Sequence, residues 1–116
     1  MKDTIRLAHE RLSAAFTEIG YGLEETTGVI DGVAVRDRFQ RYLFAWHKNE
    51  HHLLFYLRKP ALDAKSTLRQ KAISRQPEGQ VSKNPAGETT ITLNSDGEAE
   101  TLLEWLLPAL PLPQTV

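Results

Sequence analysis

Residues 42–58 read YLFAWHKNEHHLLFYLR and decide the fold class. Two short runs of aromatic and aliphatic residues, at 42–47 and 51–58, flank a polar stretch, which is typical of two strands joined by a turn. A two-residue turn at positions 49–50 predicts three pairs on the bulkier face, which should be the core face: Trp46 with Leu53, Phe44 with Phe55, and Tyr42 with Leu57. A three-residue turn would instead place Trp46 opposite His52.

A helix is predicted directly after this hairpin. Pro60 ends the strand because proline restricts the residue before it and cannot donate a ladder hydrogen bond. Residues 61–75 place alanines and a leucine on one narrow stripe and predict a helix. Alternatively, Asp63 caps a shorter helix that begins at Ala64.

The C-terminal part alternates loop, strand and helix patterns. Residues 76–88 contain two prolines and two glycines and predict a loop, whereas the β-branched residues 89–93 predict a strand. Residues 95–98 match the capping box S-x-x-E, so a helix should begin there and run to about Leu107. Prolines then leave an extended tail at about 108–116.

The N-terminal part predicts one helix and one hairpin. Apolar residues recur at spacings of three and four over residues 3–20, which indicates an amphipathic helix. The β-branched runs 26–30 and 33–35 flank Asp31-Gly32, a pair typical of a type I′ hairpin turn. The polar stretch 36–41 could continue the second strand as an exposed edge.

These elements predict an α+β fold of the two-layer sandwich type. A mainly antiparallel sheet should carry its helices on one face, in the order α-β-β-β-α-β-α. The length of 116 residues predicts a single domain spanning residues 1–116. Hydrophobic residues make up 41% of the chain and charged residues 25%, which is typical of a globular protein rather than a disordered one.

The chain has no cysteine, which excludes disulfides and thiolate metal sites within it. No apolar run is long enough for a signal-peptide core or a membrane span, so we expect a cytoplasmic protein without membrane contact. There is no glycine-rich phosphate loop, no G-x-S-x-G elbow and no restriction-nuclease carboxylate pattern. The sequence therefore predicts no catalytic residue and no cofactor, and it favours a non-enzymatic protein.

Charge is distributed unevenly along the chain. The overall net charge is −1, but residues 57–83 carry a net +5 and residues 84–116 a net −5. The basic segment predicts a surface for nucleic acid or another polyanion. Its seven basic residues are Arg58, Lys59, Lys65, Arg69, Lys71, Arg75 and Lys83. Alternatively, they form a solvated helix face whose long stems cover apolar surface.

Two further patterns could bind something. In the two-residue-turn register His47 faces His52, and two imidazoles at that distance could share a zinc ion. Alternatively, these histidines are ordinary polar residues at a hairpin tip. The tail, WLLPALPLPQTV, could dock on a partner chain or form a homodimer interface, or pack on its own domain.

Four stretches resemble a small bacterial domain often labelled a predicted transport protein, which also occurs at the C-terminal end of restriction-like proteins. The stretches are LAHERLSAAFTEIG, YLFAWHKNEHHLLFYLR, PAGETTITLNS and DGEAETLLEWLL. The resemblance covers most of the chain and implies the fold but no site residue. The element order also resembles that of small double-wing DNA-associated proteins.

Overall fold

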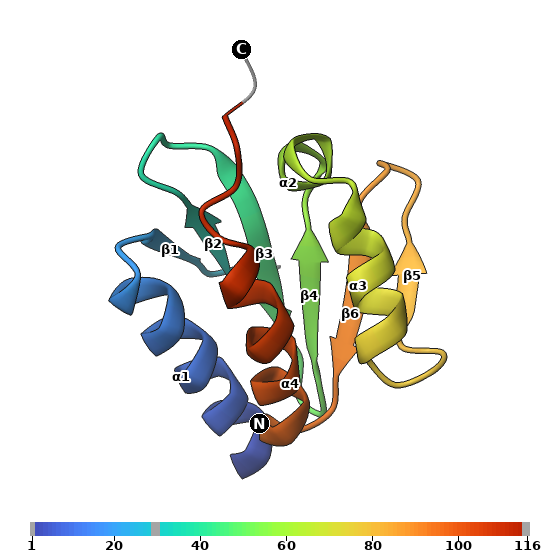
Figure 1. Ribbon diagram of the computed structural model, residues 1–116. Coiled ribbons are helices and arrows are strands. Elements are labelled where there is room, and N and C mark those ends of the chain that lie inside the picture. The colour runs from blue at the N-terminus through green and yellow to red at the C-terminus, as the bar shows by residue number, and fades with distance from the viewer. Residues whose placement is uncertain (1, 29–30, 115–116) are drawn as a thin grey trace.

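The structure is a computed structural model that describes residues 2–28 and 31–114 (Figure 1). Its helices are α1 (Asp3–Glu18), α2 (Lys59–Ala64), α3 (Thr67–Arg75), α4 (Asp96–Leu106) and the short 3₁₀ helix η1 (Leu107–Ala109). Its strands are β1 (Gly22–Thr26), β2 (Gly32–Arg36), β3 (Tyr42–Lys48), β4 (Leu53–Leu57), β5 (Val81–Lys83) and β6 (Thr89–Leu93).

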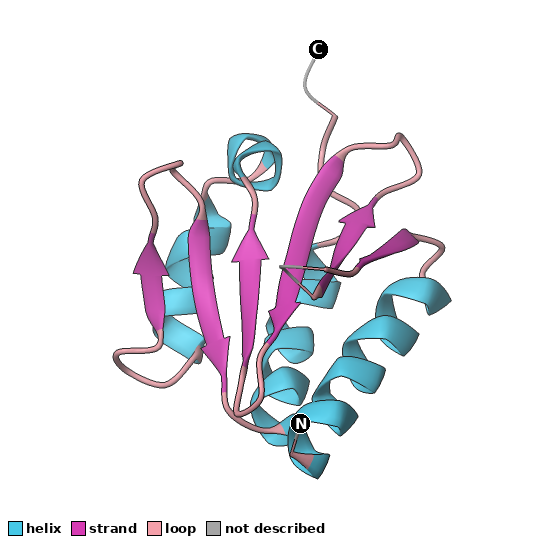
Figure 2. Cartoon of the chain, turned by 180° about the vertical axis from the view of Figure 1, so that it is seen from behind, coloured by secondary structure: helices cyan, strands magenta, loops and turns pink. Residues whose placement is uncertain are grey.

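The strands of the described ranges form a six-stranded antiparallel sheet in the order β1-β2-β3-β4-β6-β5. Helices α1, α3 and α4 lie on one face of the sheet, and the view from behind shows the sheet in front of them (Figures 1 and 2). The predicted α+β two-layer sandwich is therefore confirmed. The order differs in detail, since four strands rather than three lie between α1 and α2, and β5 lies inside the predicted loop 76–88.

The register between β3 and β4 differs from both predictions, because the whole of 49–52 lies in the connecting loop. Inside this loop the Asn49 N–H donates to the His52 carbonyl oxygen at 3.0 Å. The observed pairs are Lys48 with Leu53, Trp46 with Phe55, and Phe44 with Leu57. Relative to the two-residue turn, the pairing moves by two residues. Since side chains alternate with period two, the aromatic core face is still the predicted one.

Tyr42 is the exception on that face. A β-bulge between β2 and β3 beside Arg36 makes Leu43 an extra residue, and Leu43 takes the buried position. Tyr42 is only half-buried, and its ring is contacted by two guanidinium groups. The carbon of the Arg58 group lies 3.8 Å from the ring centroid and that of Arg36 lies 5.0 Å from it.

The predicted two-residue turn at Asp31-Gly32 is wrong. Gly32 lies inside β2 and pairs with Thr26, so the connection is longer, and the predicted strand positions 29–30 lie outside the described residues. A Cβ at Gly32 would lie 2.6 Å from the carbonyl oxygen of Trp46. The glycine is thus required by close approach of a neighbouring strand, not by a turn.

Of the polar stretch 36–41, Arg36 ends β2 and residues 37–41 form the turn after it, not an exposed edge strand. Asp37 is buried, and its Oδ1 accepts hydrogen bonds at 2.9 Å from the backbone N–H groups of Phe39 and Arg41. Its Oδ2 accepts from Nε of Arg41 at 2.8 Å. A buried carboxylate that satisfies three donors holds this turn in one conformation.

Arg41 also fastens the C-terminal segment. Its Nη1 donates to the Pro113 carbonyl oxygen at 2.8 Å, and its Nη2 donates to that of Leu112 at 2.9 Å. Leu112 is only 3% exposed. The predicted extended tail at 108–116 therefore begins inside η1, and it is held on its own domain by contacts of Leu112 and Pro113.

The predicted helix 61–75 is two helices. Pro60 occupies the first turn of α2, so this helix begins at Lys59, earlier than predicted, and Asp63 lies inside it rather than capping it. Lys65 then adopts an extended backbone with φ −151°, and α3 begins after Ser66. The break changes the direction of the chain and lets α3 lie beside α4 (Figure 1).

The capping box predicted for α4 is half formed. The backbone N–H of Glu98 donates to Oγ of Ser95 at 3.2 Å, as predicted. The Glu98 carboxylate accepts instead from the backbone N–H of Asn94 at 2.9 Å. Arg11 of α1 binds the carboxylate of Asp96 with two hydrogen bonds, of 2.6 and 2.9 Å, which fixes α1 against the start of α4.

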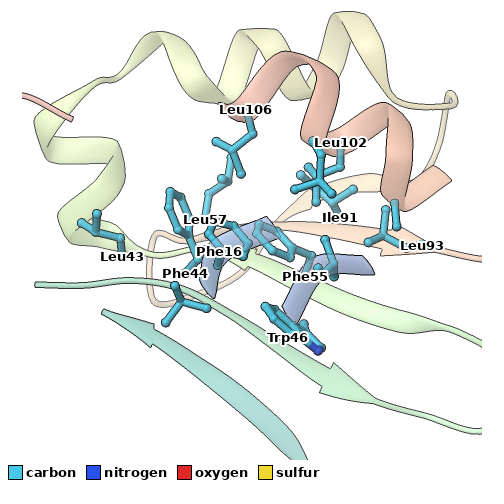
Figure 3. Close-up of a cluster of buried hydrophobic side chains, with 14 of the residues drawn as sticks. Phe16, Leu43, Phe44, Trp46, Phe55, Leu57, Ile91, Leu93, Leu102 and Leu106 are labelled. Carbon is cyan, nitrogen blue, oxygen red and sulfur yellow. The ribbon is translucent and has the colours of Figure 1, made fainter. Parts of the chain in front are cut away.

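The core is centred on Phe16 of α1. Its ring centroid lies 5.5 Å from that of Phe44, 6.1 Å from Trp46 and 6.4 Å from Phe55. All four rings are fully buried, and Leu102 and Leu106 of α4 lie on the helix side of the same cluster (Figure 3). Aromatic pairs at these separations add to the burial free energy.

Phe16→Ala should lower the free energy of unfolding by about 4 kcal/mol, because it leaves a cavity where three aromatic rings meet. Leu7→Ala on the same helix is the matched control, since Leu7 is 49% exposed and its truncation should cost less than about 0.5 kcal/mol. Urea unfolding of the two variants measures both values. A similar loss for both variants would contradict the central role of Phe16.

Candidate functional site

Three elements bring basic side chains to one concave surface. Lys59 at the start of α2, Arg69 of α3 and Lys83 of β5 line a cavity of about 310 Å³. Ser66 and Gly87 lie on the same cavity wall, and Asp63 is its only acidic lining residue in the described chain. We call this the α2–α3–β5 cavity. Three cations facing one carboxylate attract anions.

Two hydrogen bonds fix the Arg69 side chain in the wall of this cavity. Its Nε donates to Oγ1 of Thr89 at 2.7 Å, and its Nη2 donates to the Gly87 carbonyl oxygen at 3.1 Å. Both acceptors are neutral, so these bonds fix the guanidinium without cancelling its charge. Nζ of Lys59 lies 3.6 Å from Oδ1 of Asp63, but both side chains are mostly exposed. An ion pair between exposed side chains contributes little free energy.

A second groove, of about 420 Å³, runs along α3. It is lined by Thr67, Gln70, Lys71, Ser74 and Arg75, and no carboxylate is among these residues. Lys71 and Arg75 are one turn apart, and neither has an acidic partner within the described ranges. We call this the α3 groove. The Thr67 hydroxyl and the Gln70 amide can donate hydrogen bonds to anion oxygens, whereas the Ser74 hydroxyl already donates to the Lys71 carbonyl oxygen.

The remaining two predicted basic residues do not line these cavities. Arg58 donates from Nε to Oε2 of Glu88 at 2.9 Å and also packs on the Tyr42 ring, so its charge is already paired. Lys65 ends α2 and lines neither the α2–α3–β5 cavity nor the α3 groove. The structure therefore groups five of the seven predicted residues, in two neighbouring sets.

The pairing of His47 with His52 is absent, because the register that predicted it is wrong. His47 pairs with Leu54, and its Nδ1 lies 3.3 Å from the Tyr56 hydroxyl. His52 lies in the loop, where its Nε2 is 3.3 Å from Nδ2 of Asn49. In the described chain, no three histidine, aspartate or glutamate side chains are grouped as a metal site.

His9 makes a half-buried polar contact that the sequence did not single out. Its Nδ1 accepts from Nε1 of Trp46 at 3.1 Å, so the neutral ring carries its proton on Nε2. Burial, aided by the charge of Lys48, lowers the pKa of His9 below its ordinary 6.5, although Glu25 opposes the shift. The contact links residues 37 positions apart, so no local pattern reveals it.

The folded protein binds the His9 proton more weakly than the unfolded chain does. The contribution of His9 to the free energy of unfolding should therefore be fully present above a pH of about 6.5 and be lost as the pH decreases below it. Urea midpoints at pH values of about 7.5 and 5.5 measure this loss. His9→Gln keeps an acceptor for Trp46 without the titration and should flatten the dependence, whereas the exposed His51→Gln should leave it unchanged. Parallel profiles for wild type and His9→Gln would refute the assignment.

No family model, curated protein or solved structure matches this chain. The resemblance to the domain labelled a predicted transport protein therefore stays a prediction. Across residues 2–28 and 31–114, no helix combines the length and hydropathy that crossing a bilayer requires.

Proposed function

We propose that this protein is a cytoplasmic, non-enzymatic module that binds nucleic acid or another polyanion through the α2–α3–β5 cavity and the α3 groove. The observation that carries the proposal is the convergence of Lys59, Arg69 and Lys83 from three separate elements on one concave surface. Lysine and arginine bind phosphate oxygens, and release of counterions from a polyanion drives such binding.

The two basic sets lie on different sides of α3, and this arrangement favours a polymeric ligand. Arg69 faces the α2–α3–β5 cavity, whereas Lys71 and Arg75 face the α3 groove. A single small anion would occupy one of these sites. A chain of phosphates can pass over α3 and contact both.

The aromatic residues of the β3–β4 hairpin are not free to stack on bases, so the proposed contacts are to the phosphate backbone of a nucleic acid rather than to its bases. Phe44, Trp46 and Phe55 are fully buried in the core, so none of them can stack on a base. Tyr42 and Tyr56 are half-buried, but two guanidinium groups contact the Tyr42 ring and the His47 ring packs against Tyr56. Contacts to phosphate position a nucleic acid but carry no sequence information. The proposed binding is therefore largely independent of base sequence.

The alternative, partner docking or homodimer formation through the C-terminal leucines, receives no support from the fold. Leu112 is buried in its own domain, and Arg41 binds the carbonyl oxygens of Leu112 and Pro113. An oligomer built on other surfaces stays a prediction.

The test is fluorescence anisotropy of labelled single- and double-stranded oligonucleotides at about 50 and 200 mM salt. Affinity should fall at least about tenfold between these concentrations, because several phosphates are contacted. The double variants Lys59→Gln/Lys83→Gln and Lys71→Gln/Arg75→Gln should each weaken binding and reduce its salt dependence.

Arg6→Gln is the matched control. Arg6 is exposed on α1 and pairs with Asp3, outside both basic sets, so its loss should leave affinity nearly unchanged. Absence of binding at the lower salt concentration, or equal losses for Arg6→Gln and the double variants, would overturn the proposal.

A further inference from the structure

A third cavity, of about 490 Å³, opens on a different part of the molecule. Its walls come from the end of α1, the turn after β2, and the segment from η1 onward. The apolar part of its lining is formed by Ile19, Leu107, Leu110 and Pro111. We call it the Tyr21 cavity, after the residue that bears its one unpartnered buried hydroxyl in the described chain. Its volume is in the usual range for small-molecule sites.

Tyr21 is one of the residues that line this cavity, and its hydroxyl is buried and has no hydrogen-bond partner within residues 2–28 and 31–114. The residue is 8% exposed, and its ring stacks on Phe16 at a centroid distance of 6.1 Å, so the core fixes its position. Leaving a buried hydroxyl without a partner destabilises a protein, and such groups are rare in native structures. Because the hydroxyl oxygen is itself buried, a ligand acceptor satisfies it only after a small movement of the cavity lining.

Arg38 supplies a positive charge at the same cavity. Its guanidinium packs against Gly20, and a Cβ added to this glycine would lie 3.1 Å from Nη2 of Arg38. Gly20 also has a backbone φ of +87°, which favours glycine. Among the described residues Arg38 forms no ion pair. The other charged lining residue, Asp37, has both oxygens occupied and is paired with Arg41. The charge of Arg38 is therefore the one left for a ligand.

Phe39 completes the cavity with an exposed aromatic ring. It is 58% exposed, although its backbone N–H is fixed by Asp37. Beside the apolar wall of the cavity, this ring offers a second apolar surface that can contact the apolar part of a bound molecule. The exposed ring and the wall could enclose a flat or branched group.

We propose that the Tyr21 cavity binds a small carboxylic acid with an aromatic or branched apolar body. The body packs between Phe39 and the apolar wall, and the carboxylate accepts hydrogen bonds from the Arg38 guanidinium and the Tyr21 hydroxyl. The planar fork of arginine matches a carboxylate, and the single free cation matches a single negative charge. This site is separate from the basic surfaces proposed to bind polyanions.

The probe is phenylbutyrate, and phenylbutyramide is its uncharged match. In an NMR titration of backbone amides, the acid should shift resonances at 19–21, 37–39 and 107–112. The amide should bind about tenfold more weakly, since it loses a charge-assisted hydrogen bond. Equal affinity for acid and amide, or shifts confined to other segments, would overturn the proposal.

Two variants test the named contacts. Arg38→Gln should weaken binding of the acid about tenfold and leave binding of the amide unchanged. Tyr21→Phe should weaken binding of the acid while the thermal midpoint stays level or rises, because the removed hydroxyl has no partner. Wild-type affinity in both variants would show that neither group binds the ligand.

Lys71→Gln/Arg75→Gln is the matched control, because it removes positive charge from the α3 groove. It should leave phenylbutyrate binding unchanged, and Arg38→Gln should leave oligonucleotide binding unchanged. The two proposals can therefore fail independently. Loss of phenylbutyrate binding in the control variant would show that the acid responds to overall charge rather than to the Tyr21 cavity.

Discussion

The stacking of Phe16 on three aromatic rings of β3 and β4 is the contact on which the rest of the structure depends. It joins α1 to the centre of the sheet and fixes how α1 is rotated about its axis. This rotation places His9 beside Trp46 and Arg11 beside Asp96. The Tyr21 ring also stacks on Phe16, so the same contact positions a residue that lines the Tyr21 cavity.

The uneven charge along the sequence has a structural explanation. Acidic residues of the C-terminal third are largely engaged within the domain, since Glu88 binds Arg58 and Asp96 binds Arg11. The basic residues of α3 and β5 have no such partners in the described chain. A chain close to neutral overall therefore presents a surface with excess positive charge. This excess comes from the basic segment 57–83 and from the pairing of acidic residues elsewhere in the domain.

The sequence predicted the layers and the core face correctly because both depend on periodicity. The alternation of Phe44 and Trp46 survives a register error of two residues. Turn lengths were not predictable, since Asn49-Glu50 has no strong turn preference and Gly32 is required by close packing rather than by a turn. The basic segment was identified, but which of its charges remain available depends on Glu88, which neutralises Arg58 from 30 positions away in the sequence. The Tyr21 cavity was missed because its walls come from three separate segments.

The strand order also has a consequence for the path by which the chain folds. Strands β1 to β4 each lie beside their sequence neighbour, so this half of the sheet can grow by successive hairpin closures. Pairing of β4 with β6 instead closes a loop that contains two helices and a strand. Long-range closure costs more chain entropy and slows folding. We therefore expect a rate-limiting step in which β6 and the helix after it join an already assembled meander, completing the core in that same event.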